Sequence, residues 1–333
     1  MKLATLRNGR PDGQLVVVSR DLNQFVSAAK IAPTLQAALD DWDRALPRLT
    51  ELYDALIAGG VAAQPFESGL AMAPLPRAYQ FIDGSAYPQH LARVRPREGA
   101  SDEGANQRPL FYQGASDALA AANDPILLPD GDFAPDFEAE VAVIIGPLPM
   151  RPSKREATEA IRLVTVCNDV SLRRLAADDL QNFGFFHGKP ATSFAPVVAT
   201  LDELAPRWAD NKLGLHIQAS VNGVLYGQPN AAVDMQFDFA DLIAGAGLTR
   251  RLGAGTIIGS GTIANRHDET LPIKQDGIGF ACIAEARAVE KQKYGRARTP
   301  YLKSGDRVRI AAVDAEERPV FGMIDQVVKT LAP

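Results

Sequence analysis

The sequence predicts an α+β fold dominated by β-strands, with helices at the periphery and a small module at the N-terminus. Two observations favour this class: short alternating apolar runs recur between glycine and proline turns, and clear helical periodicity is rare. The 333 residues are 46% apolar and 23% charged, which is ordinary for globular proteins. The chain therefore has enough apolar residues for a sizeable core in one large or two modest domains.

Residues 1–75 are predicted to form a small α+β module. The runs 2–9 and 13–19 have the pattern of a hairpin, with Gly9 and Gly13 bounding the turn. Apolar side chains at helical spacing over 35–56 then predict a helix that ends at Gly59-Gly60, because glycine tolerates the left-handed conformation of a helix cap. Pro47 is expected to break or kink this helix. A proline-rich joint leads into a larger domain, residues 76–333.

The larger domain is predicted to be rich in strands. Asn222-Gly223 is typical of a tight hairpin turn, since both residues accept positive φ. Ser153 and Glu156 have the spacing of a capping box at the start of the one clear helix. Strands are predicted over 138–146, 163–170, 213–227, 255–263, 307–314 and 320–328.

The overall charge and the cysteines restrict the class of protein. A net charge of −5 leaves no general basic character for wrapping nucleic acid. Cys167 and Cys282 both lie in apolar stretches, a pattern of buried reduced thiols and not of a disulfide framework. No apolar stretch approaches the ~20 residues that span a bilayer, and the N-terminus lacks the apolar core of a signal peptide. We therefore expect a cytoplasmic protein without nucleic-acid or membrane partners.

Two carboxylates in one predicted strand indicate a metal site. Side chains alternate along a strand, so Glu138 and Glu140 share a face with Ala142 and Ile144. Unpaired anions near a protein interior cost several kcal/mol. A divalent cation that prefers oxygen ligands would remove this cost. The alternatives are a solvated edge strand or pairing of the glutamates with arginine.

Further acids occur at places where ligands are common. Asp169 ends the next apolar strand, and Asp83 lies in a turn-prone Asp-Gly loop. The ordered set of motifs resembles the fumarylacetoacetate hydrolase family, whose signature has an early Asp, a Glu-x-Glu strand, an Asn-Asp followed by Ser and Arg, a Gly-Lys loop and a later Gly-Thr. The matching residues here are Asp83, Glu138, Glu140, Asn168, Asp169, Ser171, Arg173, Gly188, Lys189, Gly261 and Thr262.

The resemblance implies a fold, a cofactor and an assembly. The fold is a mixed β-roll with peripheral helices, and residues 76–333 would be its catalytic domain. The cofactor is a divalent cation, magnesium first with manganese or calcium as alternatives. Its ligands would be Asp83, Glu138, Glu140 and Asp169. The family generally assembles as a homodimer.

Catalytic and substrate-binding roles follow from the same resemblance. His90, seven residues after Asp83 and in a predicted loop, matches the family's general base. Glu285, in a predicted strand, matches the glutamate that orients it, and Lys189 would stabilise a developing enolate. Tyr112, Arg173 and Thr262 match substrate contacts. Ala176 departs from the family pattern, because the relatives closest to the name-giving enzyme carry a polar group there.

The implied activity is hydrolysis of a carbon–carbon bond in a small diketo acid. Fumarylacetoacetate, an intermediate of tyrosine degradation, would give fumarate and acetoacetate. Acylpyruvate hydrolase, 2-oxo acid decarboxylase and 2-oxo-dienoate hydratase are alternatives within the family, and a metal-stabilised binding protein is the non-enzyme alternative. A nicotinamide dehydrogenase is disfavoured because no helix is predicted after the glycine-rich run 259–264. The Gly-x-Ser-x-Gly motif of serine hydrolases does not occur.

Overall fold

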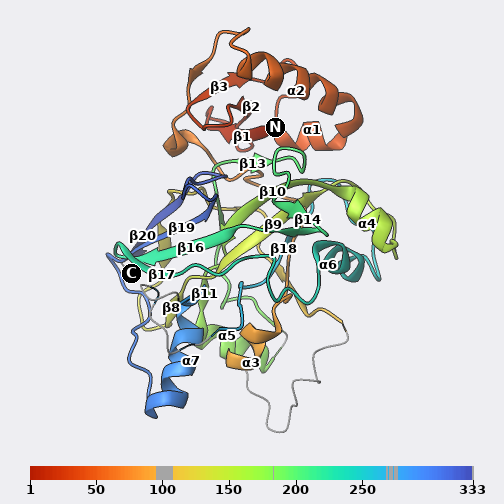
Figure 1. Cartoon of the computed structure of the whole chain (residues 1–333). Coiled ribbons are helices and arrows are strands. Elements are labelled where there is room, and N and C mark those ends of the chain that lie inside the picture. Colours follow the sequence, from red (N-terminus) through yellow and green to blue (C-terminus); the bar gives the residue numbers. More distant parts are fainter. Residues whose placement is uncertain (95–107, 183, 268, 270–272, 274–276, 332–333) are drawn as a thin grey trace.

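The computed structural model describes residues 1–94, 108–182, 184–267, 269, 273 and 277–331. Within these residues the chain forms an eleven-stranded sheet and a five-stranded sheet with helices around them, which confirms the predicted class (Figure 1). In spatial order the larger sheet contains β4 (Gln64–Pro65), β3 (Gln24–Ser27), β2 (Gln14–Val18), β1 (Lys2–Leu6), β13 (Val198–Ala199), β10 (Ile161–Asn168), β9 (Ala139–Ile145), β18 (Ile257–Gly259), β5 (Phe81–Gly84) and β6 (Phe111–Gly114), with β12 (Ser193–Phe194) paired to β10.

The other elements complete the fold. The second sheet contains β17 (Val224–Gly227), β16 (His216–Val221), β19 (Arg307–Val313), β20 (Ile324–Thr330) and β7 (Ile126–Leu128). Two short pairs join β11 (Ser171–Leu172) to β8 (Pro135–Asp136) and β14 (Trp208–Ala209) to β15 (Lys212–Leu213). The helices are α1 (Leu35–Asp40), α2 (Trp42–Ile57), α3 (Pro88–Val94), α4 (Lys154–Ala160), α5 (Arg173–Leu180), α6 (Phe239–Ala246), α7 (Ile283–Tyr294) and the 3₁₀ turn η1 (Ser68–Leu70).

The N-terminal strands extend the sheet of the larger domain. β1 and β2 form the predicted hairpin, and β1 also pairs antiparallel with β13. The helix predicted over 35–56 is divided into α1 and α2, which cover this end of the larger sheet (Figure 1). The division falls at Asp41 and not at Pro47, so the predicted position of the break was wrong. Because α2 buries Trp42, Leu49 and Tyr53, packing of this apolar face outweighs the one backbone hydrogen bond that Pro47 removes.

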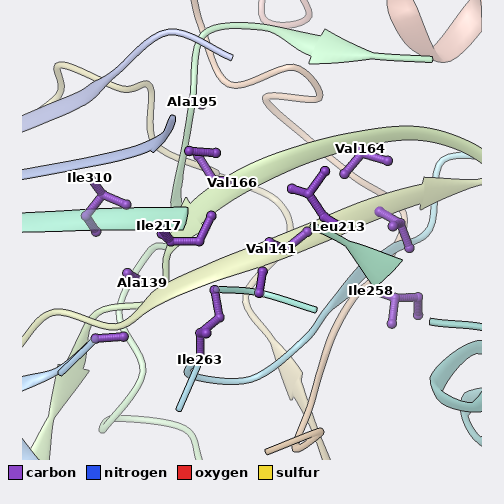
Figure 2. Packing of buried hydrophobic residues seen from close by; sticks show 14 of the residues in the cluster. Ala139, Val141, Val164, Val166, Ala195, Leu213, Ile217, Ile258, Ile263 and Ile310 are labelled. Atoms are coloured by element: carbon purple, nitrogen blue, oxygen red, sulfur yellow. The ribbon is translucent and has the colours of Figure 1, made fainter. Parts of the chain in front are cut away.

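The core lies on both faces of β9 and β10. Val141 of β9 and Val166 of β10 belong to the same buried cluster as Ile217 of the second sheet, and Figure 2 shows the three among its packed side chains. The opposite face of β9 carries Ala142 and Ile144, which pack in the cluster that contains the α1 and α2 side chains. The predicted alternation along this strand is confirmed. Since both faces are covered, a carboxylate on β9 lies inside the protein.

Several local predictions are confirmed, but the structure has more helices after residue 75 than the sequence indicated. Ser153 and Glu156 form a capping box on α4, and Asn222 and Gly223 have positive φ in the β16–β17 turn. The sequence showed one clear helix in the larger domain, whereas α3, α5, α6 and α7 also occur there. These helices have only seven to twelve residues, too few to give a strong periodic pattern. Among the described residues, no helix combines the length and apolar character needed to cross a membrane.

Candidate active site

A cavity of about 1260 Å³ collects most of the predicted site residues. Its polar lining includes Asp83, His90, Tyr112, Glu138, Glu140, Arg173, Lys189 and Thr262. The remaining two predicted residues lie directly behind this lining: Asp169 accepts a hydrogen bond from Tyr112, and Glu285 is bonded to His90. The fold therefore brings all the predicted site residues together, although they come from distant parts of the chain.

Three carboxylates, from β5, β9 and the residue that follows β10, lie close together in the site. Asp83, Glu140 and Asp169 are buried, and one oxygen of each lies within 4.8 Å of the others. Gly259 of β18 lies between β5 and β9, and a Cβ atom at this position would collide with Asp83 Oδ1. Asp83 was predicted in a loop but lies in β5, because parallel pairing with β18 outweighs the local turn signal of Asp-Gly.

The electrostatics of this cluster fit a cation site. Among the described residues, none donates a hydrogen bond to either oxygen of Glu140, although both oxygens are buried. Burial, followed by the charges of Asp83 and Asp169, raises the pKa of Glu140 well above its ordinary value. Burial and the charge of Asp169 likewise raise the pKa of Asp83 to about 7. Hard oxygen donors with this excess of negative charge suit a divalent cation, which would satisfy the oxygens of Glu140.

Glu138 has a different environment. One oxygen accepts from Arg173 Nη2 at 2.9 Å and from Thr262 Oγ1 at 2.7 Å, and the other accepts from Lys189 Nζ at 2.5 Å and from Ser171 Oγ at 3.0 Å. Although burial opposes ionisation, the charges of Arg173 and Lys189 hold the pKa of Glu138 well below its usual range. The sequence left open that the glutamates pair with arginine. This alternative holds for Glu138, whereas Glu140 has no cationic partner among the described residues. Cation ligation by Glu138 remains a prediction.

A histidine–glutamate pair lies beside the carboxylates. His90 Nδ1 is 2.6 Å from Glu285 Oε1, and His90 Nε2 is 3.8 Å from Glu138 Oε1. The second oxygen of Glu285 accepts from Arg93 Nη1 at 3.0 Å. Because one ring nitrogen is held by a carboxylate, the other is directed into the site with a defined orientation.

Both members of this pair lie on helices, which corrects the predicted loop and strand. His90 is on α3, which starts at Pro88, a residue well suited to the first helical position. Glu285 is on α7, whose first amides, Ile283 N and Ala284 N, donate to the carboxylate of Asp136 at 2.7 and 2.9 Å. This cap ends the extended segment and starts the helix.

The predicted substrate-binding cations are held by acids. Lys189 Nζ lies 2.6 Å from Asp169 Oδ2, and Arg173 Nη2 lies 2.7 Å from Asp136 Oδ2. Burial alone would lower the pKa of Lys189, but the charges of Asp169 and Glu138 raise it above its ordinary value, so the ammonium stays protonated. These contacts fix both cations at the wall of the cavity.

Three residues of the site were missed in the sequence. Asp136 caps α7 and binds Arg173, Thr192 Oγ1 donates to Asp169 at 2.7 Å, and Arg93 binds Glu285. Arg93 follows His90 by three residues, so both would have been placed on one face had residues 88–94 been recognised as a helix. Thr192 had no recognisable signal, because its contact depends on the pairing of β12 with β10.

Gly261 is expected to be required for the position of Asp83. Its φ is +77°, and its amide donates to Asp83 Oδ1 at 3.0 Å. A Cβ atom there would press against the backbone of Gly84 and Ser85. Gly261→Ala should lower the free energy of unfolding by about 2 kcal/mol or more and weaken divalent-cation binding, measured by chemical denaturation and calorimetry. Gly305→Ala is the control, since Gly305 also has positive φ but open space around it. If Gly261→Ala and Gly305→Ala weaken cation binding equally, Gly261 is not required for the position of Asp83.

The sequence matches known proteins over nearly its whole length. The profile described as fumarylacetoacetate (FAA) hydrolase C-terminal matches residues 80–329, and that described as fumarylacetoacetase N-terminal domain 2 matches residues 1–77. The chain is 28% identical over 203 residues to an uncharacterized protein of Archaeoglobus fulgidus, covering 61% of this chain and 73% of that protein.

Several relatives have named activities. The chain is 33% identical over 127 residues to oxaloacetate tautomerase YisK of Bacillus subtilis, covering 38% of this chain and 40% of that protein. It is 26% identical over 213 residues to the homoprotocatechuate catabolism bifunctional isomerase/decarboxylase of Escherichia coli, covering 62% of this chain and 46% of that protein. The chain thus spans less than half the length of each of these two enzymes.

Solved structures share the fold. Maleylpyruvate hydrolase from Sphingobium sp. SYK-6 aligns with a TM-score of 0.65 at 20% identity, covering 99% of this chain and 100% of that chain. A structure of that enzyme with manganese(II) ion and pyruvate aligns with a TM-score of 0.64 at 18% identity over the whole of both chains. Fumarylacetoacetate hydrolase from Exiguobacterium antarcticum aligns with a TM-score of 0.63 at 18% identity, covering 99% of this chain and 100% of that chain.

Proposed function

Because this chain belongs to the fumarylacetoacetate hydrolase family, we propose that it is a cation-dependent hydrolase that cleaves a carbon–carbon bond in a small 1,3-diketo acid. The observation that carries the proposal is the position of the His90–Glu285 pair beside the buried carboxylates of one cavity. A binding protein would need the carboxylates but would have no use for an oriented base next to them.

The cation would be held by Asp83, Glu140 and Asp169, with Glu138 beside them. When bound, it supplies positive charge that polarises the carbonyl oxygens of the substrate. We propose magnesium as this cation, with manganese as the first alternative, because the donor set consists of carboxylate oxygens. The manganese(II) complex of maleylpyruvate hydrolase supports a divalent cation at this kind of site.

The protein residues would move one proton in two steps. Glu285 holds the proton on His90 Nδ1, so Nε2 is free to accept a proton from a water molecule. The resulting hydroxide adds to the far carbonyl carbon, and the adjacent C–C bond breaks with its electron pair left on the departing enolate. His90 Nε2 then returns the proton to the enolate carbon. One water is consumed, and the products are an acid and a 2-oxo or 3-oxo acid.

The cationic side chains would stabilise the enolate and orient the substrate. Lys189 Nζ, fixed between Glu138 and Asp169, lies where negative charge would develop. Arg173 and Thr262 hold Glu138 in place, and Tyr112 holds Asp169. These three predicted substrate contacts therefore also position the acids of the site.

The named relatives support a second candidate. The match to oxaloacetate tautomerase YisK favours proton transfer at carbon in a 2-oxo diacid, which the same histidine could perform without water. The match to a bifunctional isomerase/decarboxylase raises the same possibility for loss of CO₂. Both reactions differ from hydrolysis in their products, so one assay separates them.

A panel of acids tests the proposal. Fumarylacetoacetate, an acylpyruvate and oxaloacetate should be incubated with the protein and Mg²⁺ or Mn²⁺, with products followed by NMR in H₂¹⁸O. We expect one ¹⁸O atom in the carboxylate released from a diketo acid and no turnover with EDTA. Oxaloacetate enol–keto exchange or CO₂ release, with no cleavage of either diketo acid, would replace hydrolysis by the second candidate.

The assembly and location of the protein remain proposals. We propose a homodimer, as implied by the family, and a cytoplasmic enzyme, since Cys167 and Cys282 are both buried as free thiols. Sedimentation velocity of the purified protein would measure the oligomeric state directly.

A further inference from the structure

The outer half of the cavity is lined by one face of α7. The helix enters the site at its N-terminus, where Glu285 faces inward to His90. Six residues of α7 line the cavity, and four of them, Ala284, Arg287, Ala288 and Lys291, are spaced so that they lie on one side of the helix; the other two are Val289 and Gln292. With a rise of about 1.5 Å per residue, Arg287 lies about 4.5 Å along the axis beyond Ala284, and Lys291 about 6 Å beyond Arg287. This face therefore leads outward from the reacting end.

The two cations of this face differ from the others of the cavity. Arg93 is paired with Glu269 and Glu285, Arg173 with Asp136 and Glu138, and Lys189 with Glu138 and Asp169. In contrast, no carboxylate oxygen in the described ranges lies within ion-pairing distance, 4.0 Å, of the side chains of Arg287 or Lys291. Neither side chain is therefore neutralised by a direct ion pair within the described ranges.

The guanidinium of Arg287 is nevertheless held in place. Its Nη1 donates to the carbonyl of Thr299, and it stacks over the ring of Tyr301 at 4.3 Å from the centroid. Glu290, the acid that interacts with its charge, accepts from Thr299 and Arg298 with both oxygens. A half-buried arginine that is held by an aromatic ring and a carbonyl, with donors left over, is suited to bind a carboxylate.

Another part of the cavity lining is apolar. It is formed by Ala176, Ala177 and Leu180 of α5 together with Phe185. Ala176 occupies the position at which, by the family resemblance, some relatives have a polar side chain. Beyond Arg173, α5 thus contributes apolar side chains to the lining, whereas α7 contributes the cations Arg287 and Lys291.

We propose that Arg287, assisted by Lys291, binds a second carboxylate at the distal end of the substrate. This inference rests on the proposed function, because the first end of the substrate is taken to lie at the buried acids. It narrows the substrate class to diketo acids with an anionic tail. The apolar α5 wall would contact the carbon chain between the two ends.

A matched pair of substrates tests the inference. Succinylpyruvate and butanoylpyruvate differ only by a terminal carboxylate in place of a methyl group. The protein with Mg²⁺ should prefer succinylpyruvate in kcat/KM, and Arg287→Met should reduce that preference about 10- to 100-fold, mainly through KM. Arg298→Met is the control, since Arg298 also stacks on a tyrosine, Tyr294, but does not line the cavity. It should leave the preference unchanged.

Binding measurements separate this inference from the proposed reaction. Calorimetric Kd values for both acids should be measured with His90→Ala and with the His90→Ala, Arg287→Met double variant. Tighter binding of succinylpyruvate that depends on Arg287 supports the inference even if the wild-type protein cleaves neither acid. Cleavage of both acids with a preference that Arg287→Met does not alter would overturn it and leave the hydrolase proposal intact. Equal binding of the two acids, or binding of neither, would also overturn it.

Discussion

Replacing His90 by alanine is expected to lower kcat by about 10²–10⁴-fold, the usual contribution of a general base. The cation should still bind with near wild-type affinity, because no oxygen of Asp83, Glu140 or Asp169 is bonded to His90 in the described structure. Glu285→Gln should lower kcat by a smaller factor than His90→Ala. Water can still hold the imidazole ring, and Arg93 can still bind the glutamine side chain. The two variants together distinguish a base from a residue that only supports the fold.

The measurement combines turnover with calorimetric titration of Mg²⁺ or Mn²⁺. His216→Ala is the control, because His216 is exposed and its side chain bonds only to the carbonyl of Gln228 among the described residues. It should retain both activity and cation affinity. Full activity of His90→Ala would mean that this imidazole does not accept the proton, whereas parallel loss of cation binding would mean that it supports the cation site.

Glu140→Gln is expected to abolish cation binding without destabilising the cation-free protein. In the wild-type protein both oxygens of Glu140 are buried beside Asp83 and accept no hydrogen bond from the part of the chain that the structure describes, which is costly. Removing the negative charge should raise the melting temperature in EDTA or leave it unchanged. The stabilisation that a cation confers on the wild-type protein, about 2.7 kcal/mol at 100 times its Kd, should disappear.

Thermal unfolding in EDTA and in excess Mg²⁺ or Mn²⁺ provides the comparison. Glu159→Gln removes an exposed carboxylate of α4 and should behave like the wild-type protein in both buffers. If Glu140→Gln unfolds at a much lower temperature in EDTA, Glu140 has a structural partner that the described contacts do not include. If it keeps the cation-dependent rise, the ion binds elsewhere.

The sequence was most informative where local pattern and tertiary position agree. The alternation along β9 correctly placed Glu140 on the face opposite Val141, with Glu138 directly before the strand, and the capping box of Ser153 correctly began α4. Both patterns depend on residues within a few positions of each other. Asp169 could be located for the same reason, since it directly follows a long apolar strand.

The sequence was least informative where distant residues decide the local structure. Asp83 lies in a strand because β18, far along the chain, pairs with it. Glu285 lies on a helix because Asp136, nearly half the chain away, caps that helix. The pairing of Glu138 with Arg173 and Lys189 also depends on three-dimensional proximity, so the sequence could not show that the two glutamates of one strand have opposite electrostatic environments.

Crystals grown with MnCl₂ test the central claim most directly. Anomalous scattering recorded at the manganese edge locates the ion independently of refined geometry. We expect one strong peak per chain, about 2.0–2.3 Å from oxygens of Asp83, Glu140 and Asp169, with His90 outside the coordination sphere. A fully occupied peak elsewhere, with no density among these three carboxylates, would contradict it.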